Sequence, residues 1–231
     1  MTARLPRIAR RAALALCTAA IALAATMNWN TVITQTPAGG HRLGNPAAKV
    51  KLVEFVSYSC PHCAAYAKES EAGLRIAYVT PGAVSVEVRP VIRNPVDLVA
   101  TMLVQCGPKE KFFLNHAAFL HDQDKWLAKW AKMGPATKQH WTTGTFAARM
   151  RAIALDLDFF TIMSRRGYSR TQSEKCLSDE GEARRIAQLS TDSAEQAGVT
   201  GTPSFVINDA LLEEVHTWAD LQPAIAAALK Q

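Results

Sequence analysis

The chain has 231 residues, of which 48% are hydrophobic and 20% are charged, a composition that excludes a disordered protein. Five cysteines are too few for a disulfide-scaffold protein of this length. The formal net charge of +6 would suggest a nucleic acid or an anionic membrane as partner if the folded surface carried it.

Residues 1–25 match the pattern of an export signal. Four arginines without an acidic residue precede the apolar stretch from Ala12 to Ala25, and small residues close it. The apolar stretch is shorter than the ~20 residues that span a bilayer, so we expect cleavage, with an uncleaved membrane anchor as the alternative. Setting these four arginines aside leaves 22 of the 26 basic residues against 20 acidic ones. The remaining basic residues are scattered, which predicts no nucleic-acid partner.

The segment 26–48 is polar and rich in glycine, and we expect an N-terminal tail there. Residues 49–58 are apolar on both parities, which indicates a strand buried on both faces. A helix is predicted from residue 61 to about residue 78, and Val84, Val86 and Val88 then alternate with polar residues as in a half-buried strand. Together these elements predict a β-α-β unit.

The segment 95–180 carries apolar residues at helical spacing and no long strand pattern, so we expect an all-helical insertion. Within it, residues 146–163 are predicted to form one helix. Another amphipathic helix is expected over residues 180–196.

Strands return at the end of the chain. Residues 204–207 and 211–215 predict a hairpin around Asn208-Asp209. Thr217 can cap a last helix, which Pro223 should delay or kink. The predicted fold class is therefore α/β: residues 49–94 and 181–231 form one domain, into which residues 95–180 are inserted.

The chemistry is expected at Cys60-Pro61-His62-Cys63, where the buried strand turns into a helix. Cys60 is predicted at the N-cap, where free N–H groups and the helix dipole favour a thiolate. Pro61 suits the first helical position, and His62 can add positive charge beside the thiolate. A haem attachment site would need histidine where Ala64 stands. A structural zinc site lacks a second pair of ligands at usable spacing, and a purely structural disulfide is the remaining alternative.

Glu54 lies within the predicted central strand, six residues before Cys60. A carboxylate among apolar residues is costly unless it has a partner or a task. We therefore expect Glu54 to lie beneath Cys63 and relay protons; the alternative is an exposed strand face.

The segment Leu52-Val-Glu-Phe-Val-Ser-Tyr-Ser-Cys-Pro-His-Cys63 resembles the active-site segment of the DsbA family of thiol-disulfide oxidoreductases, and the resemblance covers roughly residues 41–231. It implies a thioredoxin fold with an inserted helical domain, in which Cys60 is the nucleophile, Cys63 the resolving cysteine and Glu54 the buried acid. It also implies a cis-proline at Pro203 that faces the cysteines and, with Thr202, holds the substrate.

The resemblance implies a dithiol oxidase with no cofactor and no metal besides the redox-active Cys60–Cys63 disulfide. Its expected setting is the periplasm, its substrates reduced unfolded exported proteins, its re-oxidant a membrane protein of the DsbB type, and its state a monomer. Thr202 also occurs in isomerase and reductase relatives, so those activities are the alternative. Such relatives dimerise through a long N-terminal segment. Only about 20 residues separate the signal from the domain here, which argues against an isomerase. A non-enzymatic binding module is a third possibility. Cys106 and Cys176 are expected to form a structural disulfide, with two buried free thiols as the alternative.

Overall fold

The computed structural model describes residues 27–231. The predicted export signal, residues 1–25, lies outside the described residues. Within the described part of the chain, every helix is too short or too polar to cross a bilayer.

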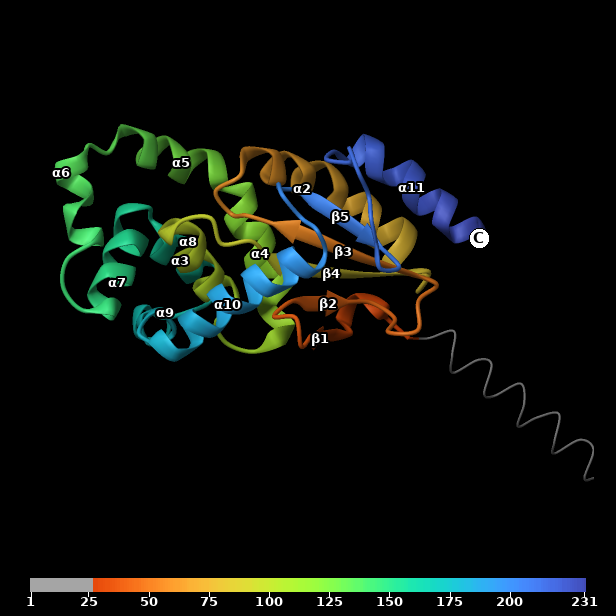
Figure 1. Cartoon of the computed structure of the whole chain (residues 1–231). Helices are drawn as coiled ribbons and strands as arrows, with labels where there is room; N and C mark the ends of the chain where they lie inside the picture. The colour runs from red at the N-terminus through yellow and green to blue at the C-terminus, as the bar shows by residue number, and fades with distance from the viewer. Residues whose placement is uncertain (1–26) are drawn as a thin grey trace, which may run out of the picture.

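The described residues form a six-stranded mixed sheet at the centre of the fold (Figure 1). Across the sheet the strands follow the order β1 (Ile33–Gln35), β2 (His41–Leu43), β4 (Val84–Pro90), β3 (Val50–Val56), β5 (Ser204–Ile207) and β6 (Ala210–Leu211). The β3 and β4 strands run parallel, whereas the other neighbours are antiparallel. Because β3 is an inner strand, the segment that leaves its carboxyl end starts from the middle of the sheet.

The predicted β-α-β unit is confirmed as β3, α2 (Pro61–Leu74) and β4, with a π-helical turn at Arg75–Val79 before β4. The prediction of a half-buried β4 is wrong, since Ser85 and Glu87 are only 1% and 4% exposed. Glu87 tolerates burial because its carboxylate accepts hydrogen bonds from the Thr36 hydroxyl and the Arg89 guanidinium, each at 2.7 Å.

The prediction of an N-terminal tail over residues 26–48 is also wrong. Residues 33–35 and 41–43 form the β1–β2 hairpin, which extends the sheet beyond β4 through the pairing of His41 with Val88. Three-residue strands give too short an alternation for recognition in the sequence, and the pairing with β4 is what holds them.

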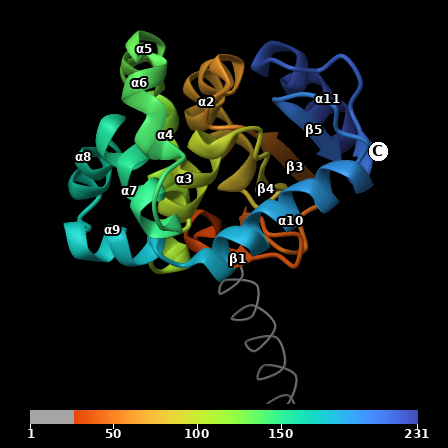
Figure 2. The ribbon, with the colours of Figure 1, turned by 60° about the vertical axis from the view of Figure 1, so that its left-hand side comes forward.

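Between Pro95 and Leu177 every assigned element is a helix, as expected. The α-helices are α3 (Pro95–Val104), α4 (Phe112–His121), α5 (Gln123–Lys132), α6 (Pro135–Lys138), α7 (Phe146–Asp156), α8 (Phe159–Arg165) and α9 (Arg170–Leu177). The single helix predicted over residues 146–163 is wrong, because the chain breaks at Asp158, which has a left-handed φ of 59°. Most of these helices gather beyond one end of the sheet, whereas α4 packs against α2 (Figures 1 and 2).

The helix α10 (Glu180–Gln196) crosses one face of the sheet, while α2 and α11 (Trp218–Lys230) cover the other (Figure 2). The returning strand predicted over residues 211–215 is too long, since β6 ends at Leu211 and Glu214 has a φ of 57°. Thr217 caps α11, and Pro223 lies inside the helix without delaying its start. The predicted α/β class with an all-helical insertion is confirmed.

Candidate active site

Cys60 is the N-cap of α2, four residues after β3 ends. Its φ and ψ of −88° and 116° are extended, and Pro61 occupies the first helical turn. The first N–H groups of a helix have no partner within it, so they point to the Cys60 side. Cys60 is 4% exposed and Cys63, one turn into the helix, is fully buried.

Cys60 and Cys63 are free thiols in this structure. The pKa of Cys60 is lowered to about 4, chiefly because the Cys63 thiol donates a hydrogen bond to its sulfur; burial opposes this shift. The Thr202 residue and the backbone N–H groups of Cys63 and His62 also favour the thiolate. Burial, the hydrogen bond to Cys60 and the negative charge of Cys60 raise the pKa of Cys63 well above its usual range. The pair is therefore strongly asymmetric: the outer sulfur is a thiolate near neutral pH and the inner one is a thiol.

His62 is exposed on the first turn of α2. It acts on Cys60 through its backbone N–H. The charge effect expected of its imidazole stays a prediction.

The Thr202–Pro203 segment faces the cysteines across the carboxyl end of the sheet. The peptide bond between these residues is cis. The Cys60 thiol lies 3.2 Å from the Thr202 carbonyl oxygen, while the Thr202 hydroxyl is buried without a partner in the resting geometry. A ring nitrogen of His216 lies 2.8 Å from the Pro203 carbonyl oxygen, where a longer β6 would have supplied a backbone donor.

Glu54 is 4% exposed, so the alternative of an exposed strand face is wrong. Its carboxylate accepts a hydrogen bond from the Tyr66 hydroxyl of α2. Burial raises the pKa of Glu54 to about 7, and the bond from Tyr66 limits the rise. Cys63 raises the pKa of Tyr66, after burial and Glu54, so Tyr66 lies within the influence of both groups. Glu54, Tyr66 and His116 line one internal cavity.

Cys106 and Cys176 are joined by a disulfide that connects the end of α3 to α9, with their Cα atoms 5.8 Å apart. This bond lies within the helical insertion, away from Cys60. Among residues 27–231, His, Cys, Asp and Glu side chains form no group of three that could hold a metal ion.

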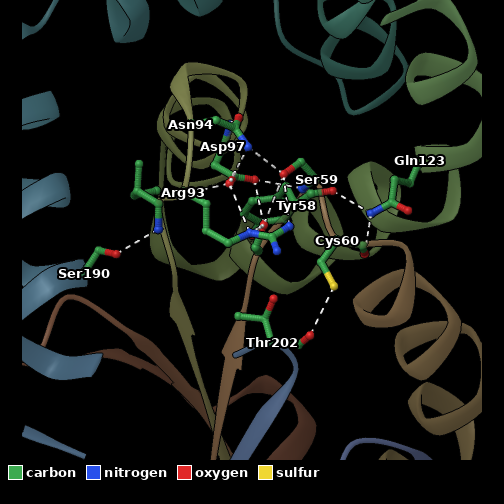
Figure 3. A network of polar contacts seen from close by, with 11 residues as sticks. Tyr58, Ser59, Cys60, Arg93, Asn94, Asp97, Gln123, Ser190 and Thr202 are labelled. Atoms are coloured by element: carbon green, nitrogen blue, oxygen red, sulfur yellow. Dashed lines mark hydrogen bonds and ion pairs between the residues drawn. The ribbon is translucent and has the colours of Figure 1, made fainter. Parts of the chain in front are cut away.

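A polar network around the segment Ser57–Cys60 was not predicted. Asp97 and Gln123 bind this segment from the helical insertion, together with Arg93 and Asn94 (Figure 3). The Asn-Pro-x-Asp pattern over residues 94–97 signals a helix start, and Asn94 does cap α3. Nothing in the local sequence points from Gln123 to a loop more than 60 residues away.

The comparisons with known proteins agree with this geometry. A family model described as thioredoxin matches residues 36–227. A solved protein-disulfide isomerase from Novosphingobium aromaticivorans is 44% identical, with a TM-score of 0.80 over 84% of this chain and 98% of its own. Wolbachia pipientis alpha-DsbA1 shares the fold at 17% identity, with a TM-score of 0.62 over 82% of this chain and 90% of its own.

A curated relative from Rickettsia bellii, provisionally named a protein-disulfide oxidoreductase, is 26% identical over 82% of this chain. A second, from Rickettsia typhi, is 26% identical over 81% of this chain. The matches cover 64% and 61% of those two proteins, so this chain spans roughly three fifths of their length.

Proposed function

Because the chain belongs to the thioredoxin family, we propose that it is a protein-disulfide oxidoreductase that oxidises protein dithiols at Cys60–Cys63. The observation that carries the proposal is the asymmetry of the two sulfurs: the Cys60 pKa is lowered to about 4 while that of Cys63 is raised. A sulfur with a low pKa is a good leaving group, and stabilising the reduced form makes the disulfide oxidising.

In the proposed cycle, a substrate thiolate attacks the Cys60 sulfur of the Cys60–Cys63 disulfide. A substrate–Cys60 disulfide forms, and Cys63 leaves and takes up a proton because of its raised pKa. The second substrate thiolate attacks the substrate sulfur of the mixed disulfide, so Cys60 leaves as a thiolate. Two electrons pass from the substrate dithiol to the enzyme, and the substrate keeps the new disulfide.

Two further groups serve this cycle in the proposal. Glu54, with a pKa of about 7, exchanges the proton of Cys63, and Tyr66 donates a hydrogen bond to Glu54 and feels the charge of Cys63. The backbone at Thr202–Pro203 holds the substrate segment as an added strand next to Cys60. The proposed substrates are reduced, unfolded proteins exported to the periplasm, and a membrane protein of the DsbB type restores the disulfide of the monomer.

The second function is disulfide isomerisation. It is favoured by the 44% identity to a protein whose solved structure is described as a protein-disulfide isomerase. An isomerase needs the reduced pair to attack wrong disulfides, whereas an oxidase needs the oxidised pair to accept electrons.

The redox equilibrium of Cys60–Cys63 with glutathione tests the proposal. We expect a potential above about −200 mV, the range of oxidising thioredoxin-like enzymes. The oxidised protein should also form disulfides in reduced ribonuclease A faster than the reduced protein rearranges scrambled ribonuclease. A potential near that of thioredoxin, about −270 mV, contradicts the oxidase proposal, and faster rearrangement favours the isomerase.

A further inference from the structure

The segment Ser57–Cys60 connects β3 to α2 and decides where the Cys60 sulfur lies. Each of its four residues hydrogen-bonds a side chain that belongs to the helical insertion or to the two residues before it. The thioredoxin-like part of the chain therefore does not hold its reactive segment alone.

Asp97, on the first turn of α3, holds one side of the segment. Its carboxylate is fully buried. One oxygen accepts the Ser57 hydroxyl at 2.9 Å and the Ser59 N–H at 2.8 Å. The other accepts the Arg93 N–H at 3.0 Å and the Asn94 amide at 3.1 Å. These four donors satisfy both oxygens of the buried carboxylate.

Gln123, at the start of α5, holds the other side. Its side chain is almost fully buried, and its amide nitrogen donates to the Tyr58 carbonyl oxygen at 2.6 Å and to the Cys60 carbonyl oxygen at 2.8 Å (Figure 3). An NH₂ group has two protons, so both are used. The two contacted carbonyl groups belong to the residues on either side of Ser59. The Ser59 N–H itself donates to Asp97.

Gln123 contacts the backbone of Cys60 itself, whereas Asp97 holds Ser57 and Ser59, which precede it. The Cys60 carbonyl accepts the N–H of Cys63 at 3.1 Å besides the Gln123 amide, so its partial negative charge is well screened. Cys60 is the extended N-cap residue of α2, so its backbone position sets how far its sulfur lies from the N–H groups that open the helix. Without the contacts of Asp97 or Gln123, the Cys60 sulfur would move away from these N–H groups for part of the time.

We propose that Asp97 and Gln123 are positioning residues of the thiol–disulfide exchange, through which the helical insertion fixes Cys60 against the N-terminus of α2. The inference rests on the proposed function and deepens it, because it assigns the acidity of Cys60 partly to residues outside the thioredoxin-like part of the chain.

The decisive variant is Gln123→Met in the full chain, since methionine has nearly the same volume and no amide. We expect the Cys60 pKa, followed by thiolate absorbance at 240 nm in the reduced protein, to rise by about one unit. The equilibrium with glutathione should shift roughly tenfold towards the disulfide form. Gln123→Glu should raise the pKa further, because its oxygens face two carbonyl oxygens. Asp97→Asn places an amide against a donor but also removes a negative charge, so its rise should be smaller than that of Gln123→Met.

Two control variants match these changes in chemistry and differ in place. Gln105→Met removes an amide of the insertion that donates to the Gly39 carbonyl oxygen at 3.3 Å, and Asp179→Asn alters the cap of α10. Both should leave the Cys60 pKa and the glutathione equilibrium unchanged. A merely structural role of Gln123 would lower the unfolding midpoint but leave the titration of the folded protein as in the wild type.

The proposal is overturned if folded Gln123→Met titrates within about 0.3 pKa units of the wild type. If Asp97→Asn does not fold, Gln123→Met decides alone. Failure of the wild-type protein to oxidise dithiols would sink the proposed function and would leave this titration still able to test the positioning role.

Discussion

At the scale of single residues, the site is built from groups whose acidities are moved in opposite directions. Cys60 and Cys63 are three positions apart on α2, yet one pKa is lowered to about 4 and the other is raised. The same hydrogen bond, from the Cys63 thiol to the Cys60 sulfur, contributes to both shifts. Glu54 shows the opposite behaviour to Cys60, because it is buried in the sheet with one hydrogen-bond donor, Tyr66.

The first prediction concerns the inner cysteine. Replacing Cys63 by alanine removes the largest cause of the low Cys60 pKa, which we expect to rise by roughly 1–2 units. Serine at position 63 keeps a donor, so Cys63→Ser should raise it less. The pH dependence of iodoacetamide alkylation at Cys60 measures both values. Equal values for the two variants would mean that the donated hydrogen bond does not matter.

The second prediction concerns Glu54 and pH. The pKa of Glu54 is about 7 in the folded protein and 4.5 in the unfolded chain. Between pH 4.5 and pH 7 the folded state therefore binds more protons than the unfolded state. Stability from this group is present below pH 4.5, falls as the pH rises, and is lost above about pH 7. The loss amounts to about 3 kcal/mol.

Urea unfolding at pH 4.5 and pH 8 of the wild type and of Glu54→Gln measures this effect. Titration of His41 and His116 is common to both proteins and cancels in the difference. We expect the wild type to lose about 3 kcal/mol more than the variant between the two pH values. An identical loss in both proteins would show that folding does not raise the pKa of Glu54.

At the scale of elements, several helices begin at a side-chain cap, and one contains a residue that disfavours helix. Asn94, Thr145, Ser169, Asp179 and Thr217 cap their helices with a side-chain oxygen. Pro223 is that residue, because it stands inside α11 where it cannot donate to the preceding turn. The helix remains continuous since its inner face is anchored by the buried Leu221 and Ile225.

The third prediction is that Pro223→Ala stabilises the protein. The position is exposed and helical, and alanine restores the missing backbone donor, so we expect a gain of about 1–3 kcal/mol. The free energy of unfolding in urea checks it, with the neighbouring Gln222→Ala as a control that should change it by less than about 0.5 kcal/mol. A loss of stability would mean that the proline ring supports the packing of α11.

The sequence predicts those elements whose cause is local. The strand before Cys60, the helix after it and α10 follow from apolar periodicity and from Pro61 at the helix start. The β1–β2 hairpin could not be found, because its short strands exist through pairing of His41 with Val88. The contact of His216 with the Pro203 carbonyl and the bonds from Gln123 to Tyr58 and Cys60 were not predicted either. Such long-range partners leave no periodic pattern in their own neighbourhood.

At the scale of the whole molecule, two connections hold distant parts of the chain together. The sheet joins β3 to β5 by antiparallel pairing of Leu52 with Ile207. The disulfide between Cys106 and Cys176 spans a sequence separation of 70 and closes most of the insertion into a loop. Since the insertion carries Asp97 and Gln123, its integrity bears on the active site as well as on stability.

The fourth prediction follows from the length of that loop. Replacing both Cys106 and Cys176 by alanine frees the unfolded chain, so we expect a loss of about 4 kcal/mol by the loop-entropy relation. Urea unfolding of oxidised wild type and of the double variant measures it. Alkylation without prior reduction should leave both cysteines of the wild type unlabelled, and labelling of either would contradict the bond.

The contact between Cys60 and Thr202 bridges 142 positions of the sequence and sets the order in which the site can come into being. A ribosome releases the cysteine pair long before it releases the loop that opposes it. The growing chain therefore passes through a stage in which both thiols are present but the facing Thr202–Pro203 segment is not yet made. The opposed arrangement of Cys60 and Thr202 is therefore one of the last parts of the site to form, and a truncated product that ends before residue 202 carries the cysteine pair without it.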